Sequence, residues 1–187
     1  MQDSRMGMYM RRRPKTVSAC GAIIFSLLSA ASAQQQVAAL PNGASSLREV
    51  YQDWSVACAV QEHTKVCSLS QDQVQQNGQR LLAIEVHRSA DGSATATLLL
   101  PIGILLDSGV TPQIDDQPPL SPLRFRTCQP TGCLAVFSID PTTLGKLREG
   151  SVLKLNVRTA AETQLTFPVS LSGLTVALDR MAALSAR

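Results

Sequence analysis

Apolar and polar residues alternate in short runs through most of the chain after about residue 50, and this pattern is typical of half-buried β-strands. The clearest run places Leu82, Ile84 and Val86 on one side of a strand. Glu85 and His87 fall on the opposite side. Asn-Gly and Asp-Gly pairs, which favour tight hairpin turns, precede and follow this run. The first half of the chain therefore predicts an antiparallel meander.

The second half predicts further strands with less regular connections. Residues 123–128 and 133–139 form a hairpin pattern around a Gln-Pro-Thr-Gly tip, and residues 152–159 and 165–171 predict two final strands. The apolar run at residues 101–106 contains Pro and Gly, so we expect it to cross the structure without forming a long strand.

Two helices are predicted among the strands. Asp140 and Pro141 form a helix start, and Gly150 ends that helix near Arg148. From Ser172, a candidate N-cap, the apolar spacing becomes helical. The apolar stripe of this C-terminal helix consists of Leu174, Ala177, Leu178, Met181 and Leu184. The whole pattern predicts a mainly β protein with one or two short helices, including a C-terminal one.

The first 33 residues have a different pattern from the rest. A basic head of three arginines and Lys15 precedes an apolar run of about a dozen residues, and Ala31-Ser32-Ala33 follows. This layout predicts a secretory signal peptide at residues 1–33, with an N-terminal membrane anchor as the alternative. We expect a flexible polar leader at residues 34–49 and one folded domain at residues 50–187, with order beginning near Val50.

Charge argues against a nucleic-acid or anionic-lipid partner. The whole chain carries 17 basic and 14 acidic residues, but five of the basic residues and one acid lie in the predicted signal peptide. The remaining 154 residues carry 12 basic and 13 acidic residues, so the basic excess is confined to the targeting segment. No second long apolar run predicts a transmembrane segment in the mature chain.

Four cysteines remain after the signal peptide: Cys58, Cys67, Cys128 and Cys133. An even number of cysteines in an exported chain indicates two disulfides. We favour the local pairs Cys58–Cys67 and Cys128–Cys133, because each brackets a predicted turn. Bridges between the two halves of the chain are the alternative. The spacings do not fit the usual zinc or redox-active cysteine pairs.

Candidate chemistry is sparse. His63 lies in a polar loop and His87 on the polar side of a strand, so we expect both to be surface residues. The pair Asp115-Asp116 lacks the further spaced oxygen ligands of a calcium loop. No nucleophile elbow, zinc-protease motif or phosphate loop occurs. We therefore expect no catalytic, cofactor-binding or metal-binding residues and a noncatalytic protein, although an enzyme with dispersed residues is a remaining alternative.

Several motifs resemble those of the invasion-associated locus B family of Gram-negative bacteria. They are Trp54-Ser-Val-Ala-Cys58, Cys67-Ser-Leu-Ser-Gln71, Leu100-Pro-Ile-Gly-Ile-Leu-Leu-Asp-Ser-Gly-Val110 with Ile114-Asp115, Gly132-Cys133 after Cys128, and Leu171-Ser-Gly-Leu-Thr-Val-Ala-Leu178. The resemblance extends from about Asp53 to Leu184. It implies an exported, single-domain antiparallel β-sandwich of immunoglobulin-like character.

This resemblance and the absence of catalytic motifs lead to one main hypothesis. We expect a periplasmic or secreted binding protein whose partner is an envelope or host-surface protein. The alternative is a periplasmic quality-control or stress accessory. The candidate binding surfaces are residues 101–109 and the acidic loop at residues 115–122. Residues 101–106 would instead be part of the core in the competing interpretation.

Overall fold

Strands dominate residues 39–186, the part of the chain that the computed structural model describes. The predicted signal peptide at residues 1–33 lies outside the described residues, so it stays a prediction. Two 3₁₀ turns, η1 (Pro41–Gly43) and η2 (Leu106–Ser108), accompany ten strands and two α-helices in the described part. The expected mainly β fold with two antiparallel sheets and a C-terminal helix is confirmed.

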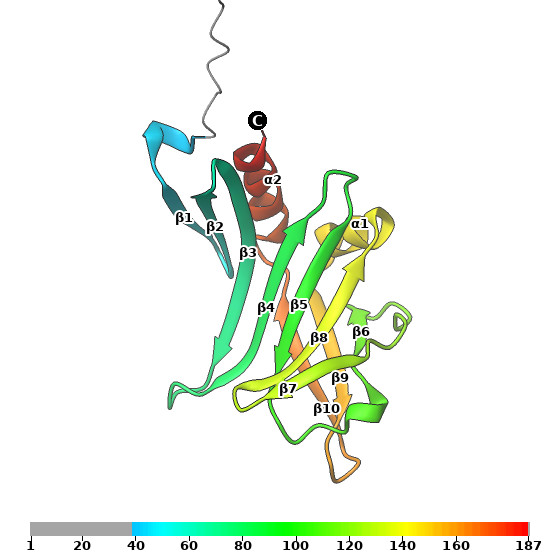
Figure 1. The fold of residues 1–187 in the computed structure, drawn as a ribbon. Helices are drawn as coiled ribbons and strands as arrows, with labels where there is room; N and C mark the ends of the chain where they lie inside the picture. The colour runs from blue at the N-terminus through cyan, green and yellow to red at the C-terminus, as the bar shows by residue number, and fades with distance from the viewer. Residues whose placement is uncertain (1–38, 187) are drawn as a thin grey trace, which may run out of the picture. The chain divides into compact units, whose positions relative to one another are not determined.

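The larger sheet has seven strands in the order β1-β2-β3-β4-β5-β8-β7 (Figure 1). Its strands are β1 (Ser46–Tyr51), β2 (Trp54–Gln61), β3 (Thr64–Val74), β4 (Arg80–Arg88), β5 (Ala94–Leu100), β7 (Phe125–Gln129) and β8 (Gly132–Ile139). Every neighbouring pair is antiparallel. The first five strands follow chain order, as a meander joined by tight turns requires.

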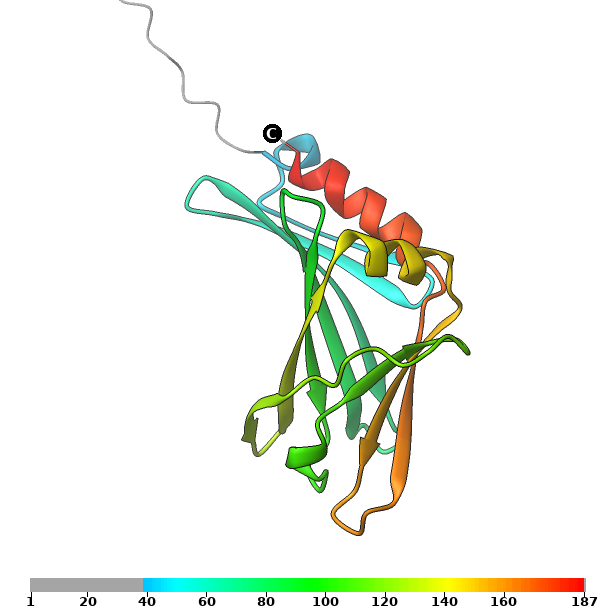
Figure 2. The same ribbon diagram turned by 90° about the vertical axis from the view of Figure 1, so that its right-hand side faces the viewer.

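The smaller sheet has three antiparallel strands in the order β10-β9-β6. They are β6 (Thr111–Ile114), β9 (Val152–Arg158) and β10 (Gln164–Ser170), and the helices are α1 (Pro141–Glu149) and α2 (Leu174–Ser185). Figure 2 shows the two sheets as separate layers with both helices near one end. Alternate residues of both sheets are buried in one shared core, as the pleat of a β-sandwich dictates.

Burial follows the predicted patterns closely. In β4, Leu82, Ile84 and Val86 are buried, whereas Glu85 and His87 are exposed. All five residues of the predicted apolar stripe on α2 are buried. Helix α1 begins after Asp140, whose carboxylate accepts hydrogen bonds from the backbone N–H groups of Thr142 and Thr143. These features could be predicted from the sequence because each one depends on residues within a single strand or helix.

The expected leader at residues 34–49 is wrong for its last part. Leu40 is only 3% exposed, and residues 46–49 belong to β1, which pairs along its whole length with β2. Three residues of β1 are half-buried, and the alternate ones are exposed. Apolar residues do not alternate regularly in this strand, because Val50 is on the exposed side and Glu49 on the half-buried side. The sequence pattern is therefore weak, and the strand depends on its hydrogen bonds to β2. Order therefore begins before Val50.

The start of α2 also differs from the expectation. The N-cap residue is Gly173 and not Ser172, and Gly173 has a left-handed backbone with φ of 85°. A Cβ atom at position 173 would overlap the carbonyl oxygen of Tyr51, so only glycine fits there. The Ser172 hydroxyl instead donates a hydrogen bond to the side-chain oxygen of Gln52. Contact with the β1–β2 turn, which sequence spacing cannot reveal, decided the position of this cap.

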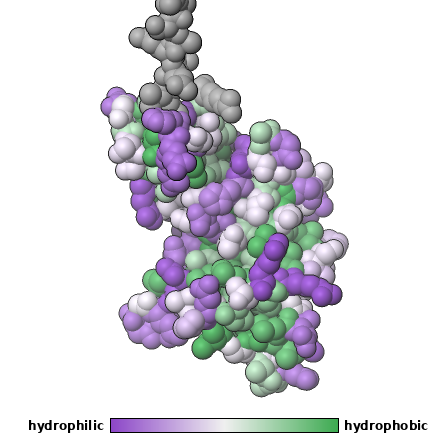
Figure 3. Space-filling model, in the orientation of Figure 1, coloured by the Kyte–Doolittle hydropathy of each residue, from purple (hydrophilic) through white to green (hydrophobic). Residues whose placement is uncertain are grey.

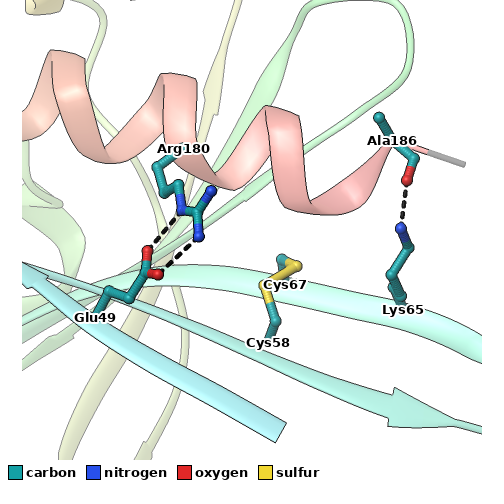
Figure 4. Close-up of a disulfide and its surroundings, with 6 residues drawn as sticks. All are labelled: Glu49, Cys58, Lys65, Cys67, Arg180 and Ala186. Carbon is teal, nitrogen blue, oxygen red and sulfur yellow. Dashed lines mark hydrogen bonds and ion pairs between the residues drawn. A yellow bond between two sulfur atoms is a disulfide. The ribbon is translucent and has the colours of Figure 1, made fainter. Parts of the chain in front are cut away.

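Helix α2 is joined to the first strands by polar contacts on either side of a disulfide (Figure 4). Arg180 donates two hydrogen bonds to the Glu49 carboxylate, with N···O distances of 2.7 and 2.8 Å. The Lys65 ammonium donates to the carbonyl oxygen of Ala186. The bidentate arginine–carboxylate geometry fixes the rotation of the helix over β1 more tightly than a single ion pair would.

Replacing Leu178 by alanine tests how far the fold depends on α2. Leu178 is fully buried, so Leu178→Ala should lower the free energy of unfolding by about 2–5 kcal/mol. Val176 on the same helix is 57% exposed, and Val176→Ala should change it by about 0.5 kcal/mol or less. Urea unfolding of the oxidised protein measures both values. Equal effects of the two substitutions would contradict the assigned packing of α2.

The Glu49–Arg180 pair should make stability depend on pH in the acid range. Hydrogen bonds from Arg180 and then from Tyr51 lower the pKa of Glu49 from 4.5 to about 2. The stabilisation is thus complete above pH 4.5 and is lost as the pH falls toward about 2. Glu49→Gln should be less stable than the parent at neutral pH, and this difference should shrink across that interval.

Denaturant unfolding at a series of pH values measures this difference. The control is Glu149→Gln, because Glu149 is exposed and its side chain makes no hydrogen bond or ion pair with the described residues. A stability difference between Glu49→Gln and the parent that stayed constant down to pH 2 would show that the ion pair does not couple protonation to folding.

Candidate binding surface

The cysteines form the two local disulfides, Cys58–Cys67 and Cys128–Cys133. Each pair occupies facing positions on neighbouring antiparallel strands, with Cα–Cα distances of 4.1 and 3.9 Å. The long-range alternative is therefore excluded. Cys58 and Cys67 are both buried beneath α2, as Figure 4 shows. In the other disulfide, Cys133 is buried but Cys128 is exposed.

The two segments expected to form a binding surface are brought together by the fold. Val110 and Leu123, which directly follow them, form an isolated antiparallel bridge with N···O distances of 2.9 and 2.7 Å. A further hydrogen bond joins the Leu120 N–H to the Pro112 carbonyl oxygen. Residues 106–109, together with Pro119 and Pro122, consequently line neighbouring grooves on one part of the surface.

Residues 101–106 are divided between core and surface. Ile104 is 8% exposed and joins the core cluster, which agrees with the core interpretation for that residue. Ile102 and Leu106, by contrast, are 66% and 48% exposed. Pro101 and Gly103 interrupt regular pairing here, and the segment ends in the η2 turn. Only its last part, from Leu106 onward, lines a groove.

The acidic loop is less available for binding than its composition suggests. One Asp115 carboxylate oxygen accepts hydrogen bonds from the backbone N–H groups of Ser151 and Val152, at 3.1 and 2.9 Å. Asp116 forms an ion pair with Lys154 at 2.9 Å, and this contact lowers the pKa of Asp116. Both carboxylates therefore hold the loop against the smaller sheet. Asp115 in particular acts as a structural acceptor for the turn between α1 and β9.

The larger groove has a volume of about 720 Å³ and lies between residues 106–109 and residues 122–128. Its second wall carries two exposed arginines, Arg124 and Arg126, on either side of the half-buried Phe125. The sequence analysis assigned no role to these arginines. The Arg-Phe-Arg triplet at the start of a predicted strand could have indicated a basic surface there. A second groove of about 330 Å³ shares Ser108 and Gly109 and reaches Arg158.

The two histidines lie outside these grooves. His63 occupies the turn between β2 and β3 and is exposed. His87 is exposed on β4 and lies 3.3 Å from the carboxylate of Glu85, a partner that the sequence analysis did not credit. Within residues 39–186, no group of three or more His, Cys, Asp or Glu residues is placed to hold a metal ion. No helix in the same range is long and apolar enough to span a membrane.

Two antiparallel sheets, two hairpin disulfides and a C-terminal helix packed on the first strands define a disulfide-bonded β-sandwich protein. The family model described as invasion associated locus B (IalB) protein matches residues 54–182. This chain belongs to the invasion associated locus B family. The disulfides and the family together indicate an exported bacterial protein.

Known relatives agree with this assignment. An invasion protein B homolog of Brucella abortus is 40% identical over 166 residues, covering 88% of this chain and 94% of the relative. Invasion protein B of Bartonella bacilliformis is 36% identical over 157 residues, covering 82% and 84%. The crystal structure of invasion associated protein B from Bartonella henselae matches with a TM-score of 0.69 and 34% identity, covering 74% of this chain and 96% of that one.

Gly109 should be essential to the geometry that joins the two segments. It has φ of 64°, and a Cβ atom there would overlap the carbonyl oxygen of Leu123. Gly103 has φ of 90° but open space around it, so Gly103→Ala should cost only backbone strain, about 1–2 kcal/mol. Gly109→Ala should cost more, because the Val110–Leu123 bridge must also shift. Urea unfolding measures the free energy of unfolding of both variants. Equal losses of stability would show that the Val110–Leu123 bridge tolerates a side chain at position 109.

Proposed function

We propose that this protein is an exported, noncatalytic binding protein of the cell envelope or the secreted fraction, and that its partner is an envelope or host-surface protein. The observation that carries the proposal is the groove of about 720 Å³ between η2 and β7. The groove is lined by a mixture of apolar, hydroxyl and arginine side chains. Two disulfides cross-link neighbouring strands of the larger sheet that carries it. Binding residues are commonly placed on loops that a rigid scaffold positions.

The relatives' names supply the partner class. The Brucella and Bartonella relatives are called invasion proteins, so a role in contact with host cells is the natural extension to this chain. A noncatalytic role is supported by the exposure of both histidines and by their position outside the two grooves beside η2. His87 lines a separate groove together with Glu85. Fold kinship alone would not justify this function, so the groove must be tested directly.

Crosslinking in the native bacterium tests this function. The mature protein, crosslinked in the intact envelope and purified under denaturing conditions, should carry one dominant envelope or host-surface partner by mass spectrometry. An exported protein of similar size without this fold supplies the background. The same digest, analysed without reduction, should contain the Cys58–Cys67 and Cys128–Cys133 peptides.

Other results would contradict the proposal in distinguishable ways. A broad set of unfolded client proteins would favour the alternative, a periplasmic quality-control or stress accessory. Recovery of no partner above background, in cells exposed to the host surface as well as in culture, would refute a dedicated protein-binding role.

A further inference from the structure

Strand β7 leaves one edge of the larger sheet open. It is the last strand in the sheet order and pairs only with β8 among residues 39–186. The other edge strand, β1, likewise pairs only with β2 among these residues, but its Glu49 forms an ion pair with Arg180 of α2. An open edge presents a row of backbone N–H and C=O groups that can pair with another extended chain. Four of the five residues of β7 are exposed.

The open edge borders a groove of suitable form. The Val110–Leu123 bridge holds together two segments that form the walls of this groove. One wall is residues 106–109, which precede Val110, and the other is residues 124–128, which follow Leu123. These two segments diverge, and the groove of about 720 Å³ lies between them. Strand β7 also has a register shift between Phe125 and Thr127, which frees the backbone around Arg126 from regular pairing with β8.

The charge of the groove selects an acidic occupant. Arg124 and Arg126 are exposed, and neither forms an ion pair or side-chain hydrogen bond within the described part of the chain. Asp107 is the single acidic residue of the lining, so the lining carries a net charge of +1. Figure 3 shows hydrophilic side chains on largely apolar surface in the lower part of the molecule, the part that contains β7 in Figure 1.

We propose that the groove between η2 and β7 binds an extended acidic peptide segment of a partner protein, which adds to β7 as a further strand. This inference deepens the proposed function and rests on it. A second copy of this chain would bring the same two arginines to the same edge, and like charges there oppose pairing. A lipid headgroup could satisfy the arginines, but it has no backbone groups to pair with the strand edge.

The test uses the oxidised mature protein and a defined peptide. The probe has about ten residues, enough for one strand, and alternates glutamate with valine. Main-chain pairing supplies much of the affinity in strand addition, so a generic sequence should bind. Amide shifts on titration should map to β7 and to residues 106–109. A peptide with lysine in place of glutamate should bind about tenfold more weakly, since it loses the arginine contacts.

Matched double variants separate local charge from net charge. Arg124→Glu/Arg126→Glu should weaken binding of the glutamate peptide by about tenfold. Arg88→Glu/Lys146→Glu makes the same change in net charge at exposed sites outside the groove and should bind as the parent does. Equal loss in both variants, equal binding of both peptides, or shifts away from β7 would overturn the proposal. Binding only to phosphatidylglycerol vesicles would also overturn it, in favour of a headgroup site.

A photo-crosslinking residue in cells distinguishes failure of this inference from failure of the proposed function. Placed at Thr127 on β7, it should capture the dominant partner. Placed at Ala90, in the β4–β5 turn, it should not capture the partner, because that turn lies near the top of the molecule in Figure 1 and β7 lies near the bottom. Capture of the partner by whole-protein crosslinking but not from position 127 would refute strand addition and leave the binding function standing.

Discussion

One backbone carbonyl connects the beginning and end of the folded chain. The carbonyl oxygen of Ser170, at the end of β10, accepts hydrogen bonds from the Trp54 indole and the Gln71 amide, both at 3.0 Å. Trp54 is 1% exposed, and Gln71 is the single buried polar side chain in the described core. Because an unpaired buried donor is costly, these two side chains hold the smaller sheet to β2 and β3 at a defined position. Helix α2 begins only four residues later, so this contact lies close to the start of the helix.

This arrangement makes the two ends of the larger sheet unequal. At the β1 end, α2 packs on the first strands, and the Glu49–Arg180 pair fixes it there. At the β7 end, no other strand of the described residues pairs with the edge, and the chain instead diverges from the Val110–Leu123 bridge to leave a groove. Both β1 and β7 are edge strands that pair on one side only among the described residues. The helix and the buried disulfide beneath it stabilise the first end, whereas the second end has a groove lined by two exposed arginines beside its edge. A binding role fits the second end better for this reason.

The sequence predicted what depends on neighbouring residues and missed what depends on distant ones. Alternation in β4 and the helical stripe of α2 each reflect one element facing one core, so both could be read directly. Residues 46–49 of β1 were assigned to the leader because only the pairing with β2 makes them part of a strand. The groove was found only in part. Its first wall was predicted as residues 101–109, but Arg124 and Arg126 come from a segment whose position beside η2 depends on one long-range bridge.

The Cys128–Cys133 disulfide restrains the open edge of the larger sheet. Cys128 lies on β7 at the groove, and Cys133 is buried on β8, so the bond fixes the end of the edge strand to the interior of the sheet. Without it, β7 would be a short edge strand with four exposed residues, and such strands fray easily. A strand that is already ordered does not lose that conformational entropy when a partner pairs with it, so preorganisation favours binding. The cysteines thus have a structural role that also supports recognition, without requiring any redox chemistry of their own.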